Sequence, residues 1–207
     1  MRGKILVAST NPGKVSELRS MLGEEIEWVG LSDFGQIETI AEDGQTFAEN
    51  ARKKAAGYAK VTGLWTIADD SGLVVDALGG QPGVKSARFS GVESKNRKLL
   101  DRKNMEKVLE LLEGVPKERR TARFVCHLVL ASPEEVLAET EGNLEGFIAE
   151  RQAGENGFGY DPIFFVPELG KTVAQISRAE KNEISHRGKA IRKLKPQLNE
   201  LLQKKFS

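Results

Sequence analysis

A short apolar run that passes directly into a capped helix constrains the fold of this chain most. Residues 5–8 are all apolar and predict a buried strand, and the small and polar residues 9–14 follow at once. Apolar side chains at 15, 18, 21 and 22 then share one helical face, with Asn11 placed to cap the helix and Pro12 at its first position. A buried strand leading into a capped helix predicts an α/β fold.

The rest of the chain alternates further strand and helix patterns. The Thr46–Glu49 segment predicts a capping box and a helix, and apolar residues at 99–112 predict another that ends near Gly114. Strands are expected at 65–68, 73–75, 121–131, 136–140 and 144–149, with a tight turn at 69–72, and the last three strands should pair antiparallel. With a final helix from about Ser185, the pattern predicts a mixed sheet with helices outside, in one domain of two lobes spanning 1–207.

Composition excludes several classes of protein. Lys and Arg number 31 against 30 Asp and Glu, so no strong field recruits nucleic acid or an anionic membrane. No apolar run approaches the roughly 18 residues of a membrane span, and the N-terminal run is too short for a signal peptide. The single cysteine, Cys126, cannot form an internal disulfide and is expected to be a small buried residue, as His127 is expected to be a satisfied core histidine. A cytoplasmic protein fits best.

The loop between the first strand and first helix is a candidate phosphate site. Helix N-terminal amides lack intrahelical partners and the helix dipole is positive there, and Lys14 adds a mobile charge. The Walker A spacing is absent, and a simple capped turn is the alternative. The candidate phosphate-binding residues are Ser9, Thr10, Asn11, Pro12, Gly13 and Lys14.

Two acidic pairs lie at the ends of predicted elements. Mg²⁺ prefers oxygen ligands and takes one or two carboxylates while phosphates and water complete its shell. Glu42-Asp43 could instead only supply negative charge at a helix N-terminus. Asp69-Asp70 points more strongly to function, because adjacent carboxylates between buried strands repel each other unless a cation or donors lie nearby.

Aromatic and basic residues in the last quarter of the chain could contact a flat ligand. Phe158 and Tyr160 lie in a glycine-rich loop and could stack on it, although packing into the core is an equal alternative. Lys181, His186 and Arg187 offer hydrogen-bond donors, or form only a solvated basic face.

Together these segments resemble the inosine/xanthosine triphosphate pyrophosphatases, a family that removes non-standard purine nucleotides. The matching segments follow the family's order and spacing over most of the chain, with Ser9-Thr10 where many relatives have Thr-Gly. They are residues 8–14, 42–51, 68–73, 77–83, 157–162, 179–182 and 185–187.

The resemblance implies Mg²⁺-dependent hydrolysis of ITP, dITP and XTP to the monophosphate and pyrophosphate. It implies an elongated mixed sheet with two lobes around a central cleft, and a homodimer. Residues 9–14 would hold the triphosphate, Glu42 and Asp70 would bind Mg²⁺ with Asp69 beside them, and Asp70 would also accept a proton. The remaining substrate contacts would come from Ser71, from a base wall of Phe158, Gly159, Tyr160 and Asp161, and from Lys181, His186 and Arg187 at the base edge.

Two other functions compete with this one. A regulatory nucleotide-binding module would need the phosphate loop but not the acidic residues Glu42, Asp69 and Asp70. A pyrophosphatase for modified pyrimidine or methylated nucleotides would differ in its base wall, and the segments 158–161 and 185–187 favour purines.

Overall fold

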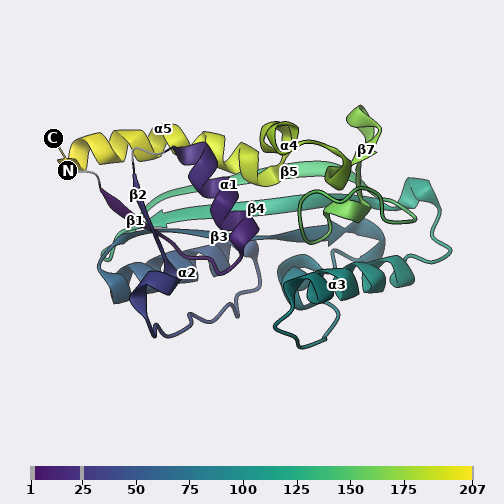
Figure 1. Cartoon of the computed structure of the whole chain (residues 1–207), viewed down its shortest axis with the longest axis horizontal. Coiled ribbons are helices and arrows are strands. Elements are labelled where there is room, and N and C mark those ends of the chain that lie inside the picture. Colours follow the sequence, from purple (N-terminus) through teal and green to yellow (C-terminus); the bar gives the residue numbers. More distant parts are fainter. Residues whose placement is uncertain (1–2, 24–25, 207) are drawn as a thin grey trace. The chain divides into compact units, whose positions relative to one another are not determined.

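A seven-stranded mixed sheet with helices beside it forms the framework of the protein (Figure 1). The structure is a computed structural model, and it describes residues 3–23 and 26–206. The strands lie in the order β2-β1-β3-β4-β5-β6-β7; β1 is parallel to β2 and β3, and β6 is antiparallel to β5 and β7. They are β1 (Lys4–Val7), β2 (Glu27–Gly30), β3 (Trp65–Val75), β4 (Thr121–Ala131), β5 (Val136–Ile148), β6 (Phe164–Val166) and β7 (Lys171–Thr172). The predicted α/β class is confirmed.

Five α-helices accompany these strands in the described residues. They are α1 (Pro12–Leu22), α2 (Phe47–Thr62), α3 (Arg97–Leu111), α4 (Arg178–Ile184) and α5 (His186–Phe206). The predicted caps are present: Asn11 Oδ1 accepts from the Gly13 and Lys14 amides, and Thr46 Oγ1 accepts from the Glu49 amide. Within the described ranges, no helix is long and apolar enough to cross a membrane.

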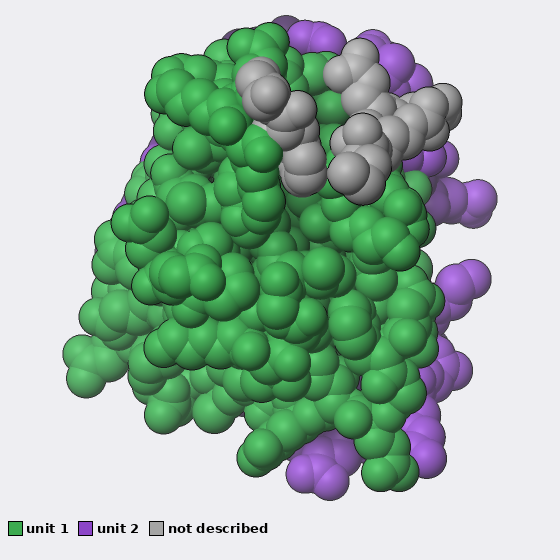
Figure 2. Space-filling model, turned by 90° about the vertical axis from the view of Figure 1, so that its left-hand side faces the viewer, with its two compact units in different colours: residues 1–70, 126–142, 186–207 green, residues 71–125, 143–185 purple. Residues whose placement is uncertain are grey.

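The chain divides into two compact units, coloured separately in Figure 2. The first unit contains residues 1–70, 126–142 and 186–207, and the second contains 71–125 and 143–185. The division falls between Asp70 and Ser71, inside strand β3.

Helices cover both faces of the sheet in the first unit. Ile5 and Val7 of β1 pack in one cluster with α1 and α5, whereas Leu6 and Ala8 pack in another with α2. Because successive strand residues point to opposite faces, this alternation shows that β1 is buried on both sides. The predicted final helix is confirmed as α5, and its Ile191, Leu194 and Leu198 are fully buried.

The second unit has its own apolar core. Met105 and Val108 of α3 pack there with residues of β3, β4, β5 and β6, and the rings of Phe124 and Phe164 stack with centroids 4.3 Å apart. This core supports the loop that precedes β6, whose residues 157–161 include predicted site residues.

Strand β3 is continuous, so the predicted tight turn at residues 69–72 is wrong. Two cations neutralise the Asp69 side chain within the sheet, and the strand does not need to bend to expose it. Gly72 is required for a different reason from a turn: a Cβ at this position would collide with the Ser86 hydroxyl and would lie 2.7 Å from the Gly83 carbonyl oxygen. A close approach between two segments explains this glycine.

Strand β5 is also continuous, whereas the sequence predicted two strands at 136–140 and 144–149. Gly142 lies at the expected break, but a Cβ there would collide with the His186 carbonyl oxygen and approach the Ala190 amide to 2.7 Å. This glycine therefore lets α5 pack directly on the strand. Strands β4 and β5 are joined by a short turn, which only antiparallel neighbours allow, as predicted.

Candidate active site

The loop between β1 and α1 places a lysine beside a capped helix N-terminus. Asn11 Oδ1 accepts from the Gly13 amide at 2.9 Å and the Lys14 amide at 3.4 Å, and the Asn11 amide donates to Ser9 Oγ at 3.2 Å. The capped-turn alternative is thus part of the structure, because the cap already uses two of the amides. Phosphate binding at this loop would depend instead on the Lys14 ammonium and the hydroxyls of Ser9 and Thr10, with Pro12 starting the helix.

Asp69 is fully buried and holds two cations from distant parts of the sequence. Its carboxylate pairs with the Lys14 ammonium on one oxygen, and its other oxygen accepts from Arg187 Nε at 2.7 Å and from the Cys126 thiol at 3.1 Å. Burial acts to raise the pKa of Asp69, but the charges of Arg187 and Lys14 outweigh it and hold that pKa well below its usual range. Asp69 is an ionised internal anchor.

Asp70, the next residue, has different partners. Its Oδ1 lies 4.0 Å from the ammonium of Lys54, a residue of α2, and the same ammonium lies 3.0 Å from Glu42 Oε1. Asp70 Oδ2 is buried and has no hydrogen-bond partner in the part of the chain that the structure describes. Glu42 and Asp70, which the family resemblance assigns to one metal site, therefore share one cationic neighbour.

Burial changes the acidity of Asp70. It raises the pKa of this carboxyl to about 6; Lys54 and Lys14 oppose the rise, while Glu42 and Asp69 add to it. A carboxyl group with this pKa can accept a proton near neutral pH more readily than an ordinary aspartate.

The Glu42 and Asp70 carboxylates fit a hard divalent cation. Asp70 Oδ2, which is buried and has no partner among the described residues, is the atom that such an ion would satisfy. Among the residues that the structure describes, no group of three or more His, Cys, Asp or Glu side chains could hold a metal. Two carboxylates alone suit Mg²⁺, which usually completes its shell with water and substrate phosphates. Asp69, predicted to lie beside them as a ligand, is instead engaged with Lys14 and Arg187.

Lys54 is a site residue that the sequence analysis missed. Its side chain is buried, donates to the Asp69 carbonyl oxygen at 2.7 Å and reaches Glu42. The signal was present in the pattern of α2, because position 54 belongs to the same helical face as the buried residues 51, 55 and 58. A lysine inside an apolar stripe indicates a buried partner.

In the second unit, the loop of residues 157–161 is organised around the Asp161 carboxylate. Asp161 Oδ2 accepts from the Phe158 amide at 2.8 Å and from the Lys181 ammonium at 2.7 Å. That ammonium also lies 4.4 Å from the centre of the Phe158 ring. Gly157 has φ +79° and a Cβ there would collide with the Asp161 carboxylate, so only glycine fits. The structure brings together Phe158 and Asp161, which the resemblance places in a base wall, and Lys181, which it places at the base edge.

Tyr160 follows the alternative that places an aromatic in the core. Its ring is buried in the apolar core of the second unit, and its hydroxyl donates to the Ser86 carbonyl oxygen at 2.8 Å. Gly159 donates its amide to Asp101 at 3.0 Å, and Ser71 is the first residue of the second unit, in β3. Tyr160, one of the residues predicted to form the base wall, therefore anchors the loop of residues 157–161 to the core of the second unit.

The three basic residues predicted to read a base edge have separate environments. Lys181 belongs to the second unit, whereas His186 and Arg187 start helix α5 in the first unit. Arg187 is 1% exposed and donates to Asp69 and, at 2.5 Å, to Glu17, so its guanidinium is engaged inside the first unit. A solvated basic face, the alternative for this group, does not describe it.

His127 is a satisfied core histidine, as predicted. It is buried on β4 and its Nε2 forms a hydrogen bond with Glu139, which also accepts two hydrogen bonds from Arg52. Cys126, beside it, is fully buried. Burial raises the pKa of the Cys126 thiol well above its usual value, so the thiol is protonated.

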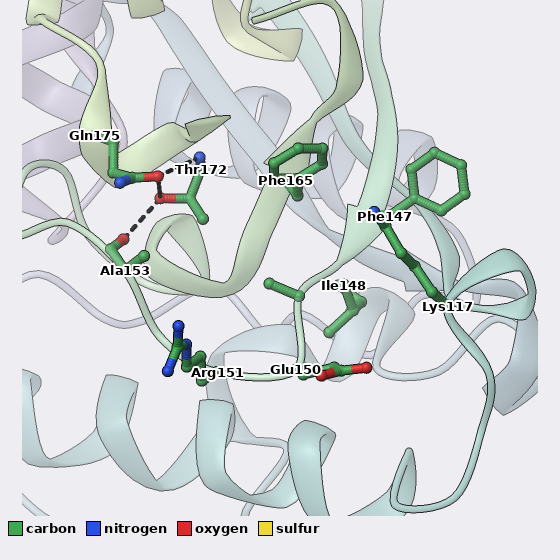
Figure 3. A pocket seen from close by; sticks show the side chains of 10 residues that line it. Lys117, Phe147, Ile148, Glu150, Arg151, Ala153, Phe165, Thr172 and Gln175 are labelled. Carbon is green, nitrogen blue, oxygen red and sulfur yellow. Dashed lines mark hydrogen bonds between the residues drawn. The ribbon is translucent and has the colours of Figure 1, made fainter. Parts of the chain in front are cut away.

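The second unit also has a pocket of about 560 Å³, shown in Figure 3. It is lined by residues from the end of β5, from β6 and from β7, and the Lys117 ammonium lies 5.7 Å from the centre of the Phe165 ring at its wall. None of the residues discussed above as site residues lines this pocket.

Comparison with known proteins matches the chain over almost its full length. The pattern of the Ham1 family covers residues 5–197. A dITP/XTP pyrophosphatase from Listeria monocytogenes is 50% identical over 97% of both chains, and one from Bacillus subtilis is 49% identical over 91% of this chain and 93% of its own. The structure of a HAM1 protein from Coxiella burnetii superposes with a TM-score of 0.84, at 41% identity, over 96% of this chain and 99% of the other.

A further solved structure, a nucleoside-triphosphatase or dITP/XTP pyrophosphatase from Mycobacterium abscessus, has a TM-score of 0.75 and 45% identity over 93% of this chain and 99% of the other. The chain shares the α/β fold of these solved structures. The chain belongs to the Ham1 family, and the predicted family membership is confirmed.

Proposed function

We propose that this protein hydrolyses non-standard purine nucleoside triphosphates, namely ITP, dITP and XTP, to the monophosphate and pyrophosphate. The observation that carries the proposal is the pair Asp70 and Glu42. Asp70 is a buried carboxyl with a raised pKa and an oxygen that has no partner in the described part of the chain, and Glu42 shares its neighbour Lys54. Relatives at about 50% identity named dITP/XTP pyrophosphatase supply the substrate class. A binding module without catalysis would not need these buried acidic groups.

The residues of the first unit would carry the chemistry. Lys14 and the hydroxyls of Ser9 and Thr10 bind the triphosphate, and the ammonium stabilises the negative charge that develops on the leaving pyrophosphate. Asp70, a buried carboxylate beside Lys54, accepts the proton of the attacking water. Lys54 adds positive charge between Asp70 and Glu42.

We propose Mg²⁺ as the cofactor, held by Glu42 and Asp70. When bound, it would lower the pKa of a coordinated water and neutralise charge on the phosphates. The Lys54 ammonium lies within 4.0 Å of both carboxylates, so the two negative charges are close enough to share a cation.

The residues of the second unit would read the base. Hypoxanthine and xanthine carry a 6-oxo acceptor where adenine carries a 6-amino donor, so a donor from Lys181 suits the former. Asp161 fixes the Lys181 ammonium at 2.7 Å and Phe158 packs beneath it, which limits the positions that this donor can take. A fixed donor facing an amino group is left unpaired, and that cost discriminates against ATP. His186 is the further candidate donor, with Ser71 a substrate contact.

Product analysis tests the reaction directly. ITP with Mg²⁺ should give IMP and pyrophosphate in equal amounts on ion-exchange chromatography, with ATP as the comparison substrate and Asp70→Asn as the inactive control. Release of IDP and free phosphate would refute the proposed cleavage between the α and β phosphates.

Assembly and location complete the proposal. The family resemblance predicts a homodimer, and composition predicts a cytoplasmic protein. Sedimentation at micromolar concentration tests the first: a clean monomer would contradict it.

A further inference from the structure

We propose that Asp69 is not a metal ligand but a positioning residue, which holds Lys14 in place with Cys126 and Arg187 fixing its own carboxylate. The inference rests on the proposed role of Lys14 in triphosphate binding. Its central observation is that both Asp69 oxygens already have donors: the Lys14 ammonium on Oδ1, and Arg187 Nε and the Cys126 thiol on Oδ2. The Asp69 side chain has no exposed surface.

A metal ion could reach Asp69 only by displacing these partners. Arg187 is 1% exposed and has a second carboxylate, Glu17, at 2.5 Å, so its guanidinium is paired in the interior. If a metal ion took Asp69 from Arg187, the buried guanidinium would keep only the Glu17 carboxylate to balance its charge, which is strongly unfavourable. Asp70, by contrast, has a buried oxygen with no partner in the described residues and can accept an ion at no such cost.

Asp69 instead controls where two lysines point. Its carboxylate holds the ammonium of Lys14, whose side chain is only 15% exposed, and its backbone carbonyl oxygen accepts from Lys54 at 2.7 Å. A lysine side chain has several rotatable bonds, so an unanchored ammonium would sample many positions. Anchored by Asp69, Lys14 presents its charge at one place beside the phosphate loop, and this lowers the entropy cost of binding a phosphate.

Cys126 supplies the third contact from the neighbouring strand β4. Its thiol lies 3.1 Å from Asp69 Oδ2, and the residue is fully buried. The ammonium on Oδ1 and the thiol and guanidinium on Oδ2 fix the rotation of the carboxylate plane. Cys126 is therefore more than a small apolar residue in the core, and its hydrogen bond is a feature that serine can replace and alanine cannot.

A double-mutant cycle tests the positioning role. Removing the charged hydrogen bond in Asp69→Asn should lower kcat/KM for ITP by about 10- to 100-fold, mainly through KM. In a Lys14→Ala background the same change should cost less than about threefold, because its effect passes through Lys14. Equal losses in both backgrounds would overturn the proposal. Full activity of Lys14→Ala would overturn the phosphate site itself, which is a separate result.

Metal binding provides the second arm. Mn²⁺ titration of the free enzyme, followed by the electron paramagnetic resonance signal of the unbound ion, compares Asp69→Asn with Glu42→Gln as matched changes of a carboxylate to an amide. Asp69→Asn should keep the wild-type affinity within about twofold, whereas Glu42→Gln should weaken it about tenfold or more. Equal weakening in both variants would show that Asp69 is a ligand.

The Cys126 variants carry the test if Asp69→Asn does not fold, as circular dichroism would show. Cys126→Ser should keep kcat/KM within about threefold of wild type, and Cys126→Ala should lose about five- to tenfold through KM. The alanine loss should vanish in the Lys14→Ala background. Equal activity of the serine and alanine variants, or a loss that persists without Lys14, would refute a positioning role for the thiol.

Discussion

Replacing Asp70 by asparagine should make the metal-free protein more stable while removing its activity. Asp70 is 6% exposed, and burial raises its pKa from an ordinary 3.8 to about 6. Ionisation therefore costs more free energy in the folded than in the unfolded protein. At about 1.4 kcal/mol for each pKa unit, the ionised side chain lowers the free energy of unfolding by about 3 kcal/mol, and asparagine avoids this cost.

The sign of the pH dependence follows from the direction of the shift. Because the pKa of Asp70 is higher in the folded state, the folded protein binds the proton more tightly. The cost is absent when both states are protonated, below about pH 4, and complete above about pH 6. The advantage of Asp70→Asn over wild type should therefore grow as the pH rises between these values.

Urea unfolding in the presence of a chelator, followed by circular dichroism, measures the difference. Asp70→Asn should gain about 2 to 3 kcal/mol at pH 8 and less than about 1 kcal/mol at pH 4. Asp43→Asn is the matched control, since the Asp43 side chain is 70% exposed and pairs with Lys53, so its loss should not stabilise. No gain at pH 8, or an equal gain at both pH values, would refute the reasoning.

The activity of the same variant should move in the opposite direction. If Asp70 accepts the proton of the attacking water, kcat for ITP should fall by about 100-fold or more in Asp70→Asn. A more stable protein with far lower turnover would identify a residue that is retained for chemistry at the expense of folding.

Three further changes test other parts of the structure. Chelator should abolish turnover and Mg²⁺ restore it, and Glu42→Gln should raise the Mg²⁺ concentration needed for half-maximal rate; full activity in chelator would contradict this. Lys181→Met should lower kcat/KM for ITP and shrink the ITP-to-ATP ratio, and an unchanged ratio would show that Lys181 does not read the base. Gly142→Ala should lower the free energy of unfolding by about 2 kcal/mol because its Cβ meets α5, whereas Gly30→Ala, with no contact closer than 3.4 Å, should be nearly neutral in the same urea titration.

Local patterns in the sequence were sufficient to predict the first strand, the capped helix that follows it and the long strand at 121–131. In each case the signal is contained within about ten residues, as with Asn11 capping the helix that Pro12 starts. The α/β class followed from these local elements.

The continuous strand at Asp69 and Asp70 could not be predicted in this way. Two adjacent carboxylates suggest a turn unless their counterions are known, and the counterions lie far away: Lys14 is 55 residues before Asp69, and Arg187 is 118 residues after it. The same long range concealed the true environment of Arg187, which the sequence places only among other basic residues. When the counterions of a buried carboxylate come from distant parts of the chain, the residues next to it in the sequence give no sign of them.

The contrast between Asp69 and Asp70 has a consequence for how this gene can change. Side chains that are adjacent in a strand point to opposite faces, and here one carboxylate meets Lys14 and Arg187 while the next meets Lys54. Inserting or deleting one residue earlier in β3 would exchange the two sides, although the letters Asp-Asp would still stand together. An alignment would score such a protein as having kept both acids, yet each would lie on the opposite face of the strand. In this chain, the register of β3 therefore matters as much as the identity of the two acidic residues on it.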